Sequence, residues 1–339
     1  MTQRCIIKQE FLKQNDLGGA TITPLPADAS FRTYSRITTK DTSYLLMDSP
    51  PDKEPVENYI KIDEHLKAQG FSSPTIHAKD VVNGFLLLED FGDDTFSHLL
   101  HTGTDPAPLY TLATETLIAM HQKTMMTALN VHPYDMPTYI REVNLFIEWF
   151  YPAITGKEIS VVQKSNWEMA WITDLGKILP TRTTLVLRDF HAGNLMLLKD
   201  KKGTDKCGLL DFQDALIGHA SYDILSLLED VRLDIDPVIE QACLEQYKTA
   251  MHTGAEFDIA YTILSAQRHA KVLGIFIRLH KRDGKDKYLQ YLPRTINLFH
   301  RAVCSDSCSN VKVWLDKYMP DYLEQASKFK LKHRFYNNI

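Results

Sequence analysis

Short β-prone runs separated by polar turns fill the first quarter of the chain and predict β-hairpins. The four runs lie at residues 31–38, 43–47, 75–79 and 84–89. Between the two pairs of runs, Tyr59, Ile62 and Leu66 recur at helical spacing, which predicts a helix over residues 53–69. The N-terminal part is therefore expected to hold strands, one helix and then further strands.

The pattern changes after residues 89–94, a Gly-containing acidic run that breaks the last of these strands. Apolar side chains then recur mostly at spacings of three and four, which predicts helices. The expected helices lie at residues 109–123, 139–150, 161–178, 222–230, 237–251, 258–280 and 289–304. One further hairpin is expected among them, because apolar runs at residues 195–198 and 207–210 flank a polar stretch that contains Gly203.

The composition is that of an ordinary soluble globular protein, with 339 residues, 44% hydrophobic and 24% charged. A net charge of −5 gives no general attraction to nucleic acid or to anionic membranes, so neither is expected as a partner. The chain shows no apolar run of membrane-spanning length and no apolar signal core near its N-terminus. Five cysteines, an odd number scattered along the chain, fit a reducing compartment and predict a cytoplasmic protein.

Three polar residues around the last hairpin carry the candidate chemistry. Asn194 precedes its first strand and Asp211 follows its second, and an antiparallel pair brings these outer ends together. Hard oxygen ligands placed close together suit Mg²⁺. Asp189 lies five residues before Asn194, where its carboxylate can accept the proton of an attacking hydroxyl. This combination is typical of phosphoryl transfer, which depends on positioning and on charge neutralisation by metal ions.

The sequence around these residues resembles the aminoglycoside phosphotransferase family, whose small-molecule kinases share the two-lobed protein-kinase fold. The resemblance is carried by Leu25–Arg32, Gly84–Asp90, Leu187–Met196, Leu209–Asp223 and Ala266–Phe276. Within the family the chain is most similar to bacterial kinases that phosphorylate the anomeric hydroxyl of N-acetylmuramate and N-acetylglucosamine during cell-wall recycling. The resemblance implies ATP and Mg²⁺ as cofactors, a small-molecule sugar as substrate, Asp189 as catalytic base, and Asn194 and Asp211 as metal ligands.

The same resemblance implies an α+β, protein-kinase-like fold of two lobes. Residues 1–88 would form a small β-rich N-lobe that has one main helix and binds the nucleotide. Residues 89–94 would form the hinge. Residues 95–339 would form a larger, mostly helical C-lobe with the catalytic loop, the metal site and the substrate-binding helices.

The nucleotide phosphates are expected near residues 26–32, a segment without the glycines that many kinases have there. Ser30 and Arg32 can donate hydrogen bonds to phosphate oxygens, although an ordinary turn is the alternative. The strand at residues 43–47 has no lysine where the family places one. Arg32 or Arg36, on the preceding strand, is therefore expected to supply the missing positive charge.

Two further sets of residues are expected to serve the nucleotide. Glu57 is predicted to be the acidic partner of that arginine, and Glu64 on the same helix face is the alternative. A solvated face shared with Lys61 is the other interpretation of these two glutamates. Backbone groups from Glu89 to Phe91 are expected to hydrogen-bond the adenine at the hinge.

Substrate contacts are expected from Asp214 and from the helix predicted over residues 258–280. Asp214 follows Asp211 by three residues and can lie beside the metal or cap the next segment. Arg268 and Lys271 fall on a face next to an apolar stripe, where they can meet an acidic sugar substituent such as the lactyl carboxylate of muramate. The alternative is a solvated basic face.

Other functions stay open at this point. An aminoglycoside kinase or another small-molecule alcohol kinase would use the same catalytic residues. The Gly-free segment and the missing strand lysine also fit a catalytically silent, kinase-like binding protein. Protein kinase activity is disfavoured, because no recognisable peptide-docking segment follows Asp211. The sequence gives no prediction of the oligomeric state.

Overall fold

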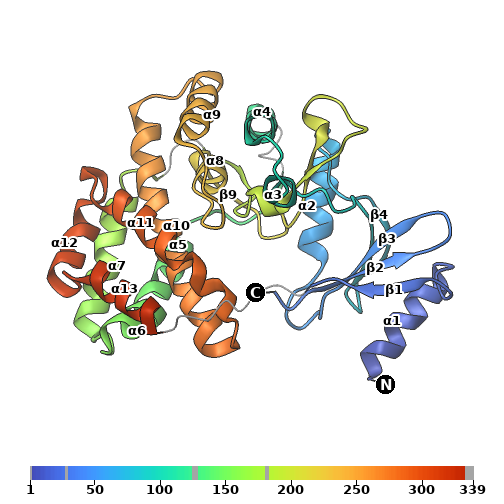
Figure 1. Ribbon diagram of the computed structural model, residues 1–339, viewed down its shortest axis with the longest axis horizontal. Coiled ribbons are helices and arrows are strands. Elements are labelled where there is room, and N and C mark those ends of the chain that lie inside the picture. Colours follow the sequence, from blue (N-terminus) through green and yellow to red (C-terminus); the bar gives the residue numbers. More distant parts are fainter. Residues whose placement is uncertain (1, 27–29, 124–128, 180–182, 333–339) are drawn as a thin grey trace. The chain divides into compact units, whose positions relative to one another are not determined.

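The computed structural model describes residues 2–26, 30–123, 129–179 and 183–332. The chain divides into two compact units, of which unit 1 holds residues 1–125 and 187–215 and unit 2 holds residues 126–186 and 216–339 (Figure 1). The chain therefore returns to unit 1 for the segment that contains Asp189, Asn194 and Asp211. The lobe boundaries expected from the sequence, with a hinge at residues 89–94, stay a prediction.

A five-stranded antiparallel sheet forms the β-rich part of unit 1. Its strands are β1 (Thr21–Pro24), β2 (Thr33–Thr38), β3 (Ser43–Asp48), β4 (Ile76–Asp80) and β5 (Phe85–Glu89), in the spatial order β1-β2-β3-β5-β4 (Figure 1). Both hairpins expected in this part of the chain are present. The sequence pattern misses β1, because all of its residues are exposed and Pro24 lacks the amide proton that a ladder uses.

The helices of unit 1 are α1 (Gln3–Gln14), α2 (Glu57–Ala68), α3 (Phe96–His101) and α4 (Pro106–Gln122). Phe11 of α1 stacks on Phe85 of β5, with ring centroids 5.7 Å apart. The predicted helix between the hairpins is present as α2, but it begins at Glu57 rather than at residue 53. Pro55 explains the difference, since the residue before a proline is disfavoured in the helical conformation.

Unit 2 consists mainly of helices, namely α5 (Met136–Leu145), α6 (Tyr151–Thr155), α7 (Val161–Leu175), α8 (Ser221–Leu228), α9 (Pro237–Ala250), α10 (Ala255–Asp283), α11 (Leu292–Val303), α12 (Ser309–Tyr318) and α13 (Tyr322–Lys332). A π-helical turn, Phe146–Phe150, joins α5 to α6. The long helix α10, orange in Figure 1, packs against α5, α8 and α11. Gly274 permits the close approach to α5, because a Cβ there would lie 2.3 Å from the backbone of Leu145. The predicted α+β class is confirmed.

A two-stranded antiparallel pair, β6 (Thr183–Val186) and β9 (Leu216–His219), also belongs to unit 2. Its register pairs Val186 with Leu216, so the two ends of residues 187–215 are held together. The sequence pattern does not predict this pair, because each strand has four residues and such short apolar runs are ambiguous. The pair matters for the site because the segment that carries Asp189 and Asp211 begins directly after β6 and ends directly before β9.

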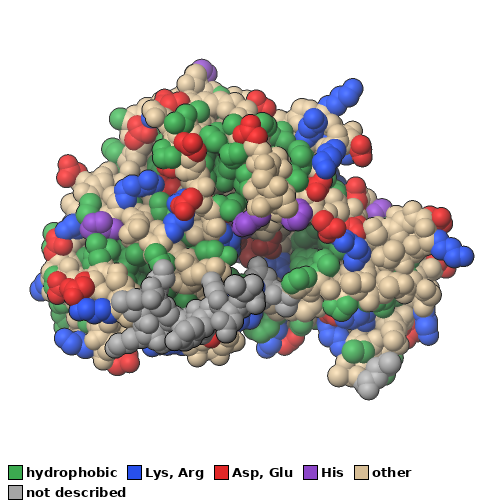
Figure 2. All heavy atoms as spheres, viewed as in Figure 1, with side chains coloured by type: hydrophobic (Ala, Val, Ile, Leu, Met, Phe, Trp, Pro, Cys, Tyr) green, Lys and Arg blue, Asp and Glu red, His purple; other side chains and the backbone are tan. Residues whose placement is uncertain are grey.

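Charged side chains of both signs share the surface of the protein. On the face shown in Figure 2, acidic and basic side chains are interspersed. Within the described ranges, no helix combines the length and the apolar character that crossing a membrane requires. The absence of a nucleic-acid partner, expected from the net charge, stays a prediction.

Candidate active site

The hairpin of strands β7 (Leu195–Leu197) and β8 (Cys207–Leu209) brings the two predicted metal ligands together. Its register pairs Leu195 with Leu209, and the N–H of Leu210 donates to the carbonyl oxygen of Asn194 over 3.0 Å. The side chains that flank the two strands therefore meet at one end of the ladder, where Asn194 Nδ2 lies 3.4 Å from Asp211 Oδ2. The structure thus has the expected hairpin and places its end residues side by side.

The loop before the hairpin holds Asp189 through its backbone. Asn194 Nδ2 donates to the Asp189 carbonyl oxygen over 3.0 Å, and the His191 N–H donates to the same oxygen over 3.1 Å. His191 is buried, and its Nδ1 accepts the Gly193 N–H over 3.2 Å. The imidazole therefore supports the loop, and the Asp189 carboxylate stays the candidate base.

Two residues of this region have left-handed backbone conformations that side chains other than glycine rarely adopt. Their φ angles are +71° at Arg188 and +55° at Asp211. Such conformations cost about 1–3 kcal/mol each and cluster at active sites. Arg188 Nη1 donates to the Asp214 carbonyl oxygen over 3.2 Å, so a side-chain contact joins the two strained segments.

The Asp211 carboxylate lies among groups of both charges. Arg32 Nη2 is 3.4 Å from its Oδ1, and Gln213 Nε2 donates to the same oxygen over 2.8 Å. Partial burial of the carboxylate, followed by the negative charge of Asp189, raises the pKa of Asp211. The exposed Asp214 adds a smaller contribution of the same sign. Because the negative charges of Asp189 and Asp214 act on this carboxylate, a cation bound next to Asp211 would be stabilised.

The available donor atoms fit Mg²⁺. Asn194 Nδ2 donates to the Asp189 carbonyl oxygen, so Oδ1 is the Asn194 atom that can bind a cation. Asp211 contributes a half-exposed carboxylate. Across the described residues, no three His, Cys, Asp or Glu side chains converge on one metal position. Mg²⁺ usually takes one or two protein carboxylates together with substrate phosphates and water, so a small protein donor set is sufficient.

Arg32 connects the glycine-free segment to the candidate metal site. Its side chain is 9% exposed, with Nε 2.8 Å from Glu54 Oε2 and Nη2 3.4 Å from Asp211 Oδ1. Ser30 Oγ donates to Glu54 Oε2 over 2.7 Å and accepts the Arg32 N–H over 2.9 Å. The guanidinium is therefore held between the carboxylate of Glu54, which precedes α2, and that of Asp211, at the end of the β7–β8 hairpin.

The acidic partner of this arginine differs from the one predicted. Glu57 lies exposed in the first turn of α2, and Glu64 pairs with Lys79 over 3.7 Å. Glu54 pairs with the arginine instead, because the connection before α2 is not helical and turns its carboxylate toward the guanidinium. The prediction that Glu57 pairs with this cation is wrong. Residues 27–29, in the middle of the expected phosphate segment, lie outside the described residues.

Arg36, the other arginine considered in place of the strand lysine, contacts the segment predicted as the hinge. Its Nε is 2.7 Å from Asp90 Oδ2, and its Nη2 is 2.8 Å from Asp93 Oδ1. Ser43 Oγ donates to the same Asp90 carboxylate over 2.8 Å. The hydrogen bonds to Asp93 and Asp90 raise the pKa of Arg36. Arg32, and not Arg36, therefore reaches the candidate metal-binding carboxylate.

Glu89 and Phe91 border a pocket of 320 Å³ within unit 1. The Glu89 carboxylate accepts hydrogen bonds from the N–H and the Oγ1 of Thr75, at 3.0 and 2.7 Å. Phe91 lies against Gly208, where a Cβ would come within 3.0 Å of the aromatic ring. The remaining lining residues are Asp90, Asp94, Leu197, Leu198, Lys199, Asp200 and Lys201. The adenine contact expected from the backbone of this segment stays a prediction.

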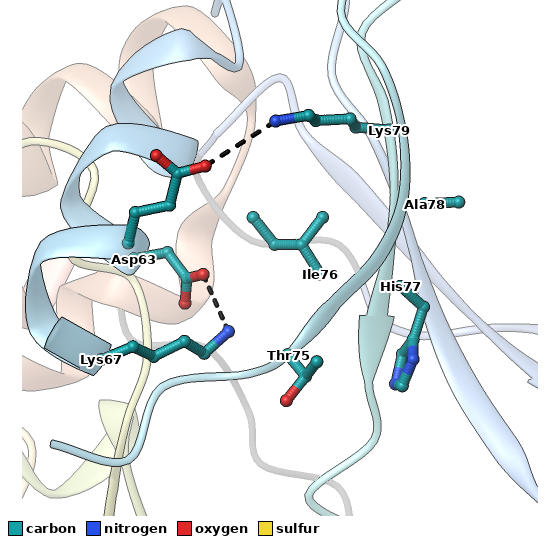
Figure 3. A pocket seen from close by; sticks show the side chains of 8 residues that line it. Asp63, Lys67, Thr75, Ile76, His77, Ala78 and Lys79 are labelled. Carbon is teal, nitrogen blue, oxygen red and sulfur yellow. Dashed lines mark hydrogen bonds and ion pairs between the residues drawn. The ribbon is translucent and has the colours of Figure 1, made fainter. Parts of the chain in front are cut away.

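A second pocket, of 280 Å³, lies between α2 and β4 (Figure 3). Of the residues considered for the site, only Glu64, the alternative to Glu57, is among those that line it. Lys79 of β4 pairs with Glu64 of α2 across it, over 3.7 Å. On α2, Tyr59 packs against Phe212, with ring centroids 4.8 Å apart. The helix is therefore tied both to the sheet and to the residue that follows Asp211.

The two cations expected to contact the substrate are buried in unit 2. Arg268 is 4% exposed and donates from Nη2 to Ser226 Oγ over 2.8 Å. Lys271 is 8% exposed, lies 3.6 Å from Glu142 Oε2 and donates to the Tyr222 hydroxyl over 2.9 Å. The alternative of a solvated basic face is therefore excluded, and the charge of Lys271 is balanced by Glu142.

Comparison with known proteins decides the family. Residues 21–257 match the phosphotransferase enzyme family. The chain belongs to that family. This phosphotransferase is 31% identical to the N-acetylmuramate/N-acetylglucosamine kinase of Caulobacter vibrioides, over 94% of this chain and 98% of the relative. It is 34% identical to proteins of the same name from Neisseria meningitidis serogroup B, over 83% and 85% of the two chains, and from Pseudomonas aeruginosa, over 84% of each.

Solved structures of distant phosphotransferases have the same fold. The ADP-bound aminoglycoside phosphotransferase APH(2'')-Ib gives a TM-score of 0.60 at 13% identity, over 90% of this chain and 98% of that chain. A microcompartment-associated aminopropanol kinase also gives 0.60, at 14% identity, over 90% and 99% of the two chains. Identities this low establish the fold alone. The predicted kinase-like fold with a β-rich lobe and a mostly helical lobe is confirmed.

Two residues of this phosphotransferase's candidate site escape prediction from the sequence. Glu54 falls in what looks like the first turn of a helix, although Pro55 is a signal that the helix starts later. Gln213 follows the hairpin directly, and nothing in the sequence indicates that its amide contacts Asp211. Both contacts depend on side-chain directions that the hydrophobic pattern does not specify.

Proposed function

We propose that this phosphotransferase transfers the γ-phosphoryl group of ATP, with Mg²⁺, to the anomeric hydroxyl of an N-acetylated amino sugar. The observation that carries the proposal is the gathering of Asp189, Asn194, Asp211 and Arg32 around one end of the β7–β8 hairpin. The choice of acceptor is supported by the relatives named N-acetylmuramate/N-acetylglucosamine kinase. A cytoplasmic location is part of the same proposal.

In this mechanism Asp189 acts on the acceptor sugar. Its carboxylate accepts the proton of the anomeric hydroxyl while the hydroxyl oxygen attacks the γ-phosphorus. The bond between the γ-phosphorus and the bridging oxygen breaks, and that oxygen leaves with its electron pair as part of ADP. The products are a sugar 1-phosphate and ADP. The contacts of the Asp189 carbonyl oxygen with Asn194 and His191 hold the loop in position for this step.

Asn194 and Asp211 would hold the metal ion. When bound, Mg²⁺ neutralises charge on the phosphates and on the leaving oxygen. Gln213 and Arg32 both contact Oδ1 of Asp211 and thereby fix the plane of its carboxylate. Of the remaining candidates, Asp214 adds negative charge near Asp211. Arg268 and Lys271 stay predicted substrate contacts.

Arg32 and Glu54 would take the parts that a strand lysine and its acidic partner have in most kinases. Glu54 neutralises and orients the guanidinium, and Ser30 supports both through its hydroxyl. A guanidinium can form two parallel hydrogen bonds to a phosphate group, so it can replace the ammonium of a lysine. The backbone from Glu89 to Phe91 would bind the adenine.

Replacing Arg32 by Gln is expected to weaken ATP binding by about 10- to 100-fold, since hydrogen bonds to charged groups contribute about 1.5–3 kcal/mol. Arg32→Lys should retain part of the affinity, because an ammonium still binds phosphate as a point charge. Calorimetric titration with the nonhydrolysable analogue AMP-PNP in the presence of Mg²⁺ measures both variants.

Arg282→Gln is the matched control for this prediction. Arg282 is exposed on α10 and pairs with its neighbour Asp283 over 2.7 Å, so its loss should leave nucleotide affinity unchanged. If the Arg32→Gln variant kept its melting temperature and bound the nucleotide as tightly as the unaltered protein, Arg32 would not contribute to nucleotide binding.

The acceptor is tested by ADP release with Mg-ATP and N-acetylmuramate, N-acetylglucosamine, glucose or kanamycin. Turnover confined to the two acetylated amino sugars is the expected result. Turnover on kanamycin would instead indicate an antibiotic-modifying kinase. Absence of ADP release with every acceptor, in a protein that still binds nucleotide, would favour the catalytically silent binding protein.

A further inference from the structure

The guanidinium of Arg36 joins strand β2 to residues 90–93, the connection that follows β5. Its Nε lies 2.7 Å from Asp90 Oδ2, and its Nη2 donates to Asp90 Oδ1 over 3.1 Å. The same guanidinium donates to both carboxylate oxygens of Asp93, over 2.8 and 3.2 Å, and to the Gly92 carbonyl oxygen over 3.2 Å. One side chain of the sheet thus contacts three of the four residues of this connection.

Asp90 makes this arrangement depend on Arg36. Its side chain is 3% exposed, and its carboxylate also accepts from Ser43 Oγ over 2.8 Å and from the Gly92 N–H over 3.0 Å. Burial acts against the charged form, yet the hydrogen bonds from Ser43, Arg36 and the Gly92 N–H lower the pKa of Asp90. A buried carboxylate that loses its cation is costly, whereas the pair with Asp93, 77% exposed, contributes little. The Arg36–Asp90 pair is therefore the main link between β2 and the connection.

The same segment also contacts the β7–β8 hairpin. The Leu197 N–H donates to the Asp94 carbonyl oxygen over 2.9 Å, and Lys199 Nζ lies 2.6 Å from Asp94 Oδ2. The ring of Phe91 packs directly against Gly208, where a Cβ would come within 3.0 Å of it. All of these residues belong to unit 1, as do the two candidate metal ligands at the end of the hairpin. One hairpin therefore supports both the segment and the candidate metal site.

We infer that Arg36 and Asp90 are positioning residues for the recognition of adenine, because they hold the backbone of residues 89–91 in the conformation that binds the base. The contacts of Arg36 go to two carboxylates and to the Gly92 carbonyl oxygen, so they leave the backbone of residues 89–91 to the nucleotide. The inference rests on the proposed function. It gives Arg36 an indirect role at the base, where the sequence suggested a direct role at the phosphates.

The composition of the segment explains why it needs such a support. Four of the six residues from Glu89 to Asp94 are acidic, so their charges repel one another. Gly92 has a φ of +83°, a conformation that residues other than glycine rarely adopt. Arg36 and Lys199 supply the cations that keep these charges together. Hydrogen bonds weaken steeply when their angles change, so a base contact made by this backbone requires a fixed conformation.

The test compares two nucleotide analogues that differ only in the base. AMP-PNP and GMP-PNP have the same ribose and phosphates, so the ratio of their dissociation constants, measured by calorimetric titration with Mg²⁺, isolates base recognition. The unaltered protein should bind AMP-PNP at least about 10-fold more tightly, the amount that two neutral hydrogen bonds contribute. Arg36→Gln should weaken AMP-PNP binding by about 10-fold and GMP-PNP binding by less than about threefold. Arg32→Gln should instead weaken both to the same degree and leave the ratio unchanged.

The outcomes separate this inference from the proposed function. An unchanged ratio in Arg36→Gln, whether both affinities fall together or neither falls, would overturn the inference alone. Equal binding of the two analogues by the unaltered protein would overturn the adenine contact and the inference with it, while ADP release with the amino sugars would still test phosphoryl transfer. Absence of AMP-PNP binding by the unaltered protein would overturn both.

Two further variants complete the experiment. Arg282→Gln, the exposed arginine of α10, is the control and should leave both affinities unchanged. Ser43→Ala is the milder variant if Arg36→Gln does not fold, because it removes one hydrogen bond to the Asp90 carboxylate and keeps the ion pair. It should lower the ratio by about two- to fivefold, and an unchanged ratio would again contradict the inference.

Discussion

An Asp189→Asn variant is expected to lose turnover by about 10³-fold, within the range that general base catalysis contributes. Asparagine has nearly the same shape as aspartate but cannot accept the proton of the sugar hydroxyl. Asn194 Nδ2 and the His191 N–H both donate to the backbone carbonyl oxygen of residue 189, and the substitution leaves these two contacts of the loop unchanged. ADP release with Mg-ATP and N-acetylglucosamine measures the loss.

The matched control applies the same substitution to Asp41, which is exposed in the turn between β2 and β3. Asp41→Asn should leave turnover unchanged, and both variants should bind AMP-PNP as tightly as the unaltered protein. Unchanged turnover in Asp189→Asn would exclude this residue as the base. A joint loss of nucleotide affinity and thermal stability would instead indicate that the Asp189 side chain supports the fold of the loop.

The parts of this fold that can be predicted from the sequence are those fixed by local pattern. Period-two runs and turn residues locate the hairpins β2–β3, β4–β5 and β7–β8, and the last of these brings Asn194 and Asp211 together. The juxtaposition follows from the topology of an antiparallel pair and needs no knowledge of the rest of the chain. The strands β6 and β9 are not predictable in this way, because about thirty residues separate two short runs that pair only in the folded protein.

Side-chain partners are harder to predict than the elements that carry them. Glu57 and Glu64 share a helix face as expected, yet Glu54 in the preceding connection is the residue that binds Arg32. Arg36 stands four residues after Arg32 and pairs with Asp90, 54 residues away along the chain. Turn geometry and strand register decide which of several nearby charged side chains form ion pairs. Hydrophobic periodicity predicts neither of them.

The basic residues of α10 illustrate the same limit. Helical spacing places Arg268 and Lys271 beside an apolar stripe, but it does not show that both are buried. Lys271 is held by Glu142, whereas Arg268 Nη1 has no hydrogen-bond partner within the described ranges, and this difference appears only with the tertiary contacts. Two cations that look equivalent in the sequence therefore have different surroundings in the folded protein.

An Asp211→Asn variant is expected to bind the metal about 10- to 100-fold more weakly, because it removes the charged member of the proposed ligand pair. Turnover should fall by about 10³-fold, since metal ions contribute several kcal/mol of charge stabilisation in phosphoryl transfer. Electron paramagnetic resonance of Mn²⁺, titrated in the presence of ADP, measures the affinity directly. Asn194→Ala should weaken Mn²⁺ binding less than Asp211→Asn does, because it removes a neutral ligand.

Asp205→Asn is the control, since Asp205 is exposed in the connection between β7 and β8 and lies on the same hairpin. Its Mn²⁺ affinity should equal that of the unaltered protein. If Asp211→Asn also kept its Mn²⁺ affinity, Asp211 would not be a metal ligand. Its contact with Arg32 would then be its main role, and loss of that contact should weaken nucleotide binding to the same degree as Arg32→Gln. Measuring both affinities on both variants therefore assigns the carboxylate either to the metal or to the guanidinium.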